Sequence, residues 1–148
     1  MEEWKSAAHA RYILWYHFVW TPKYRREMIR GEAVRSKIRE VLREIEQRYD
    51  IEIKKVGIAL DHLHLFLGAA PRYSPSEIAN IIKSITAKEL LRAFPWIREE
   101  LWGGEFWEVG YAVRTVGDKV TAEIVKRYIE GHHKSSGHEP HEIQFELF

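Results

Sequence analysis

The chain has 148 residues, of which 45% are hydrophobic and 13% aromatic, a composition that predicts one folded domain over residues 1–148 and excludes an intrinsically disordered chain. Because cysteine is absent, disulfide bonds, thiolate metal sites and a cysteine nucleophile are excluded as well. The formal net charge is only +1, so a nucleic-acid partner must be argued from where the charges lie.

Neither a membrane span nor a secretory signal is visible in the sequence. No apolar run approaches the roughly 20 residues that a membrane-spanning helix needs. The first residues also lack the basic segment, apolar run and cleavage site of a signal peptide. We therefore expect a cytoplasmic protein without a membrane partner.

The first predicted elements are a strand and a long helix. Residues 11–20 are rich in aromatic and β-branched side chains, which suit a strand, and Pro22 interrupts it because proline cannot donate to a ladder. Over residues 32–49, apolar side chains recur with the 3.6-residue period of an amphipathic helix. Arg35 and Arg39 lie on another face of this helix, which is either a solvated face with ion pairs or a stripe that contacts DNA.

Two strands and a second helix follow. Residues 51–58 and 60–69 are predicted to be strands joined by a tight connection, and so to form an antiparallel hairpin. The next helix is expected to begin after Ser74, because Ser74 and Glu77 have the spacing of a capping box. Pro95 marks the end of that helix.

The last part of the chain supplies a fourth strand, over residues 106–116, and a third helix from Thr121 through Tyr128. Residues 134–148 form either a docked tail or an extra strand. The order strand, helix, strand, strand, helix, strand predicts an α+β fold: a ferredoxin-like (RRM-like) split βαβ sandwich with an antiparallel sheet, its core over about residues 10–133. The helix that carries Tyr128 is an addition at the C-terminal side.

Asp61-His62-Leu63-His64-Leu65 is the first segment that indicates chemistry. On a strand, His62 and His64 point to one face while Leu63 and Leu65 point to the other. Two imidazoles side by side can chelate one divalent cation. Two strand histidines that only form local hydrogen bonds would have the same spacing, so both interpretations stay open.

Tyr128 and His132 are the second indication. They lie four positions apart, and so on one face of a helix that continues this far. A tyrosine and a metal ligand could then meet at one site. Alternatively, Tyr128 joins Ile124 and Val125 in a stripe that faces the core, and Gly131 is typical of a helix end.

Several linked segments resemble the single-tyrosine HUH transposases of small, hairpin-ended insertion sequences. They are the DHLHL segment at 61–65, LWGGEFW at 101–107, the segment from Gly110-Tyr111 to Val116-Gly117, and KRYIE at 126–130. Together they extend the likeness from about Tyr12 to His132. Linked motifs in the family's order are more specific than any one of them alone.

The resemblance implies a metal-dependent transposase that cleaves and rejoins single-stranded or hairpin DNA and so mobilises an insertion sequence. It implies that Tyr128 is the nucleophile of a 5′-phosphotyrosine intermediate, and that His62 and His64 bind Mg²⁺ or Mn²⁺. His132 stands at the position of the family's third metal ligand, which is usually Gln. An imidazole at this position would favour Mn²⁺ over Mg²⁺. The family also forms homodimers in which one subunit's tyrosine helix completes the partner's histidine site.

Five basic residues are candidate phosphate contacts, with ordinary surface charge as the alternative for each: Lys23, Arg25, Arg26, Lys83 and Lys88. Two other functions also stay open. One is a non-catalytic RRM-like module that binds nucleic acid. The other is a related HUH nuclease of the replication or relaxase type.

Overall fold

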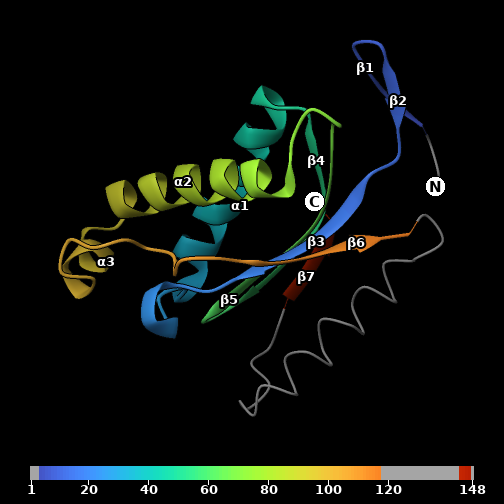
Figure 1. Cartoon of the computed structure of the whole chain (residues 1–148). Helices are drawn as coiled ribbons and strands as arrows, with labels where there is room; N and C mark the ends of the chain where they lie inside the picture. Colours follow the sequence, from blue (N-terminus) through green and yellow to red (C-terminus); the bar gives the residue numbers. More distant parts are fainter. Residues whose placement is uncertain (1–3, 118–143, 148) are drawn as a thin grey trace.

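In the computed structural model, which describes residues 4–117 and 144–147, a five-stranded antiparallel sheet lies at the centre of the fold (Figure 1). The strands of this sheet are β3 (Trp15–Trp20), β4 (Ile51–Ala59), β5 (His62–Ala69), β6 (Ala112–Val116) and β7 (Gln144–Leu147). A separate hairpin and the helices complete the described elements: β1 (Lys5–Ala7), β2 (Ala10–Tyr12), the short 3₁₀ helix η1 (Lys23–Arg25), α1 (Gly31–Arg48), α2 (Pro75–Ala93) and α3 (Pro95–Glu100).

The sheet has the strand order β6-β3-β5-β4-β7. Helix α1 connects β3 to β4 and α2 connects β5 to β6, so the chain follows the split βαβ order that the sequence predicted. The ferredoxin-like α+β fold is therefore confirmed. The open question about the tail is answered in part, because β7 adds a strand beside β4.

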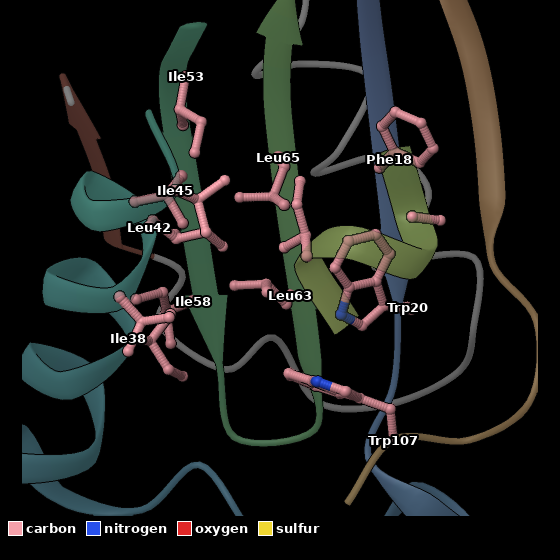
Figure 2. Close-up of a cluster of buried hydrophobic side chains, with 14 of the residues drawn as sticks. Phe18, Trp20, Ile38, Leu42, Ile45, Ile53, Ile58, Leu63, Leu65 and Trp107 are labelled. Carbon is pink, nitrogen blue, oxygen red and sulfur yellow. The ribbon is translucent and has the colours of Figure 1, made fainter. Parts of the chain in front are cut away.

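One face of the sheet is covered by α1 and α2 (Figure 1). Leu63 and Leu65 of β5 point to this side and are fully buried in a cluster with Ile38 and Leu42 of α1 (Figure 2). Burying a side chain of this size contributes roughly 1.5–3 kcal/mol, so each of these contacts stabilises the packing of α1 on the sheet. Alternation along β5 leaves the histidines on the opposite face.

The two long helices, α1 and α2, agree with the sequence patterns that predicted them. The α1 residues that face the sheet are Val34, Ile38, Val41, Leu42 and Ile45, all buried. At the start of α2, Ser74 Oγ accepts from the Glu77 backbone N–H at 3.1 Å, and Glu77 Oε1 accepts from the Ser74 N–H at 2.9 Å, so the predicted capping box is present.

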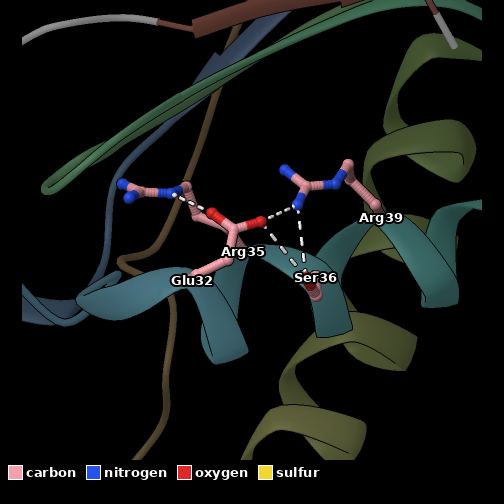
Figure 3. Close-up of polar contacts among 4 residues, drawn as sticks. All are labelled: Glu32, Arg35, Ser36 and Arg39. Atoms are coloured by element: carbon pink, nitrogen blue, oxygen red, sulfur yellow. Dashed lines mark hydrogen bonds and ion pairs between the residues drawn. The ribbon is translucent and has the colours of Figure 1, made fainter.

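The exposed face of α1 carries a small ion-pair network (Figure 3). Glu32 accepts from Arg39 and Ser36 with one oxygen, and from Arg35 at 3.4 Å with the other. These contacts favour the solvated, ion-paired interpretation of this face over a DNA-contacting stripe.

Two predicted strands begin several residues later in the structure than the sequence predicted. The segment 11–20 is divided, because Tyr12 belongs to the β1–β2 hairpin and β3 begins at Trp15. The strand predicted at 106–116 begins only at Ala112, because Gly110 has a φ of 93° and interrupts the extended backbone. Before that break, Trp107 forms a single bridge with Pro22.

The predicted third helix, with Tyr128 and His132, lies outside the described residues. Among the helices that are described, none combines the length and the apolar character that a membrane span requires.

Candidate active site

His62 and His64 lie side by side on the face of β5 that points away from the helices. Their ring centroids are 5.9 Å apart and the ring planes are inclined by 21°. Both rings are buried, with 6% of His62 and 1% of His64 exposed. The same-face placement follows from the strand alternation, whereas the role of the two residues as metal ligands stays a prediction.

Asp61 fixes the orientation of the His62 ring. Its Oδ1 lies 2.6 Å from His62 Nδ1, and both side chains are buried. A carboxylate only accepts, so Nδ1 carries the hydrogen and, in the neutral ring, Nε2 keeps its lone pair. A carboxylate behind the distal ring nitrogen is the arrangement that orients histidine ligands in metal sites. This role of Asp61 could not be predicted from the DHLHL segment alone, because it depends on the side-chain contact to the His62 ring.

Arg25 contacts the other nitrogen of His62. Its Nη2 lies 3.2 Å from His62 Nε2 and 4.0 Å from Asp61 Oδ2. A guanidinium has no lone pair to offer, so it donates to the imidazole nitrogen. One of the five candidate phosphate contacts is therefore located directly at the histidine pair.

The loop that carries Arg25 has an unusual backbone. Tyr24 and Arg25 have φ angles of 59° and 53°, in the left-handed region that side-chain-bearing residues rarely adopt. The Lys23 N–H donates to the Phe106 carbonyl at 2.7 Å, and the Tyr24 N–H donates to Glu108 Oε2 at 3.1 Å. Part of the LWGGEFW motif and the glutamate after it thus hold the loop against the site.

A third histidine extends the row. His17 of β3 is 3% exposed, and its ring centroid lies 5.9 Å from that of His64 with the planes inclined by only 10°. His17 was not predicted from the sequence, because its position beside His64 depends on the register between β3 and β5, in which Val19 lies opposite His64. From the alternation of side chains along β3, only one thing could be predicted: His17 and Phe18 point to opposite faces of the sheet.

The donor chemistry of the pair fits a divalent ion. Imidazole nitrogens ligate divalent transition ions, Mn²⁺ in preference to Mg²⁺, and His62 has the carboxylate partner that such ligands usually have. Within residues 4–117 and 144–147, no group of three or more His, Cys, Asp or Glu side chains is arranged to hold a metal. The pair offers two protein donors, and the predicted third, His132, lies outside the described residues together with Tyr128.

The other candidate phosphate contacts have different surroundings. Arg26 Nη1 donates to the Glu100 carbonyl at 2.7 Å, and Lys23 Nζ lies 3.5 Å from Glu108 Oε1. Lys83 Nζ donates to the carbonyls of Glu108 and Gly110 at 2.8 and 2.7 Å, and burial lowers its pKa. Lys88 is exposed on α2, in the helix layer on the far side of the sheet from His62. Arg25 is thus the candidate that reaches the histidines.

Comparison with known proteins identifies the family of this chain. The model of the family described as "Transposase IS200 like" matches residues 10–132. The ISDra2 transposase TnpA of Deinococcus radiodurans is 34% identical over 122 residues, which cover 82% of this chain and 86% of that protein. The transposase for insertion sequence element IS200 of Salmonella typhimurium is 35% identical, over 81% of this chain and 78% of its own length.

A solved structure supports the same assignment. The crystal structure of a transposase from Deinococcus radiodurans R1 superposes with a TM-score of 0.69 and 31% sequence identity, covering 87% of this chain and 98% of that one. The chain therefore belongs to the IS200-like transposases, the single-tyrosine HUH family that its motifs resemble.

Proposed function

We propose that this transposase cleaves and rejoins single-stranded, hairpin-containing DNA through a 5′-phosphotyrosine intermediate on Tyr128, in a reaction that requires Mg²⁺ or Mn²⁺ and mobilises an insertion sequence. The observation that carries the proposal is the buried His62–His64 pair, with Asp61 2.6 Å behind the His62 ring. Membership of the transposase family supports DNA strand transfer as the overall reaction.

His62 and His64 would hold the metal, with His132 as a third donor. A bound divalent ion would neutralise the charge of the scissile phosphate, which otherwise repels a nucleophile. Asp61 keeps the His62 ring in place and leaves its Nε2 lone pair directed to the site. The guanidinium of Arg25 lies at the same position and supplies a positive charge for the phosphate.

The cleavage step is an in-line exchange of one ester for another. The Tyr128 phenolic oxygen forms a bond to phosphorus, the bond from phosphorus to the 3′ oxygen breaks, and that oxygen leaves as a 3′ hydroxyl after taking up a proton. The phenol gives up one proton, so the step is balanced. A 3′ hydroxyl from another strand can reverse the step and release Tyr128, so rejoining needs no nucleotide cofactor.

The proposal includes a homodimer. Strand β6 forms one edge of the sheet, and among the described elements it pairs with β3 alone. Residues 112–115 of β6 are exposed, so this edge of the sheet is accessible to a strand of a second copy. Joining two sheets at this edge would place the partner's residues beside the histidine-bearing face.

The test is a covalent adduct on labelled, hairpin-bearing single-stranded DNA in the presence of Mn²⁺. We expect an adduct with the wild-type protein, and none with Tyr128→Phe or after chelation with EDTA. A Tyr128→Phe variant that cleaves as well as the wild type would contradict the nucleophile assignment. A non-catalytic RRM-like module would bind this DNA and give no adduct under any of these conditions.

A further inference from the structure

Arg25 occupies the nitrogen of His62 through which a metal would bind. Asp61 engages Nδ1 at 2.6 Å, which leaves Nε2 as the only ring nitrogen that can be a ligand. The Arg25 Nη2 lies 3.2 Å from this Nε2. A lone pair that accepts an N–H cannot bind a cation at the same time. The Arg25 contact and a metal on His62 therefore exclude each other.

The backbone of the loop indicates that this contact is built into the fold. Two successive non-glycine residues, Tyr24 and Arg25, are left-handed, a costly conformation that persists only where the surroundings impose it. The constraints lie on both sides of Arg25. The Lys23 N–H donates to the Phe106 carbonyl, and Arg26 Nη1 donates to the Glu100 carbonyl, both at 2.7 Å.

The position of the guanidinium also lets it leave. The Arg25 side chain is 47% exposed, whereas that of its partner Asp61 is 7% exposed. Arg25 thus spans the border between the buried histidine and solvent, where a DNA phosphate would arrive. A guanidinium binds an anionic phosphate more strongly than a neutral imidazole, so the incoming strand offers it a better partner.

We propose that Arg25 is a displaceable latch on His62. The guanidinium blocks Nε2 of His62 to a metal ion, and when a DNA strand binds it moves from His62 to a phosphate of the strand, which opens Nε2 to the metal. This inference rests on the proposed function, because it takes His62 as a metal ligand and single-stranded DNA as the substrate.

The latch predicts effects of opposite sign for two ligands. Loss of the Arg25 guanidinium removes a competitor for the His62 lone pair, so the metal binds more tightly. The same loss removes a phosphate contact, so DNA binds more weakly. A residue that only contacted DNA would weaken DNA binding without changing metal affinity through His62.

The first measurement is Mn²⁺ affinity without DNA, from the electron paramagnetic resonance signal of free Mn²⁺. Arg25→Gln is expected to bind Mn²⁺ about 2- to 10-fold more tightly than the wild type, as for the loss of one competing hydrogen bond. Lys23→Gln is the control for the lost charge, because it removes one positive charge from the same loop at a side chain that lies 3.5 Å from Glu108, while the Lys23 backbone N–H that donates to Phe106 is kept. Equal changes in both variants, or no gain in Arg25→Gln, would overturn the latch.

The second measurement is the affinity for a short single-stranded oligonucleotide in EDTA, from fluorescence anisotropy over a series of salt concentrations. Arg25→Gln is expected to bind less tightly and to reduce the salt slope by about 0.7, as for one lost phosphate contact. Unchanged affinity and slope would overturn the transfer to phosphate. Circular dichroism checks the fold, and Arg25→Met replaces Arg25→Gln if the latter loses helical signal.

His62→Ala separates the failure of the latch from the failure of the proposed function. If His62→Ala loses Mn²⁺ binding while Arg25→Gln matches the wild type, the metal site stands and the latch is wrong. If neither the wild type nor Arg25→Gln binds Mn²⁺ at the histidines, the metal site of the proposed function is wrong as well.

Discussion

The two nitrogens of His62 have different partners, and the carboxylate of Asp61 determines which of them carries the hydrogen in the neutral ring. Asp61→Asn keeps the size of the side chain but removes the charge that strengthens the hydrogen bond to Nδ1. We expect Mn²⁺ affinity to fall about 10- to 100-fold, the usual cost of losing the carboxylate behind a histidine ligand. The measurement is Mn²⁺ titration, with thermal unfolding to check the fold.

Asp50→Asn is the matched control for Asp61→Asn. Asp50 pairs with Arg72 at 2.9 Å on the surface, and its side chain is 52% exposed. The same chemical change there should leave Mn²⁺ affinity unaltered. An Asp61→Asn protein that binds Mn²⁺ as tightly as the wild type would show that Asp61 does not orient a ligand.

Gly68 of β5 is required for a steric reason. A Cβ at this position would lie 2.9 Å from Trp15 Cζ3 and 3.1 Å from the Leu14 carbonyl oxygen. Because backbone cannot yield as a flexible side chain can, Gly68→Ala should lower the free energy of unfolding by about 1–3 kcal/mol. Urea denaturation measures the loss.

A double-mutant cycle tests this explanation. In a Trp15→Leu background the indole ring is gone, so Gly68→Ala should cost less than it does in the wild type. An equal cost in both backgrounds would assign the loss to the Leu14 carbonyl alone.

Local signals predicted the histidine pair, but the surroundings of the pair depend on contacts far apart in the sequence. His62 and His64 share a face because of the period of two along one strand. His17 comes beside His64 only through the register of β3 on β5. Arg25 reaches His62 only because Tyr24 and Arg25 are left-handed, and neither residue has the glycine that would signal such a turn.

At the scale of elements, the start of α2 is determined by the capping box of Ser74 and Glu77. The backbone N–H of Ser74 donates to the Glu77 carboxylate and lowers its pKa. The unfolded chain therefore binds this proton more tightly than the native chain. The stabilisation is fully present above the unfolded pKa of about 4.3, and it is lost as the pH falls through the lower native pKa.

Two variants separate the parts of this cap. Ser74→Ala removes the hydroxyl that accepts from the Glu77 N–H, and should lower the free energy of unfolding by about 1 kcal/mol at pH 7. Glu77→Gln should be less stable than the wild type at pH 7, and the difference should be smaller at about pH 3, because the wild-type carboxylate takes up a proton as the pH falls. Urea unfolding at both pH values measures this. A difference that does not shrink in acid would contradict the linkage.

Helices and strands differ in how far the sequence could predict them. The apolar period of α1 and the capping box of α2 lie within each element, so their limits were predicted to within a few residues. The segment before β6 could not be predicted in this way. Its conformation depends on the bond from Lys23 N to the Phe106 carbonyl and on the Lys83 contacts to Glu108, which join distant parts of the chain.

At the scale of the whole molecule, the exposed edge of β6 is the proposed dimer contact. Val113 lies on this strand and is 39% exposed. A lysine at a sheet edge opposes pairing with another sheet, so Val113→Lys should shift the protein from dimer to its monomer mass of 17.6 kDa. Light scattering after size exclusion measures the mass. Val109→Lys is the control, because Val109 is 80% exposed but lies outside the strands of the sheet.

A mixture of two inactive variants tests whether the dimer shares its active sites. His62→Ala retains Tyr128, and Tyr128→Phe retains the histidines, so neither homodimer should form a DNA adduct. After subunit exchange, a mixed dimer with shared sites has one intact site, made from the histidines of one chain and the tyrosine of the other. With random exchange we expect about a quarter of the wild-type adduct yield, because half of the dimers are mixed and each has one working site. The adduct must then be on the His62→Ala chain, which a size tag on either chain reveals by electrophoresis. Sites that are complete within each subunit would give no adduct at any mixing ratio, because every chain would lack either its histidine or its tyrosine.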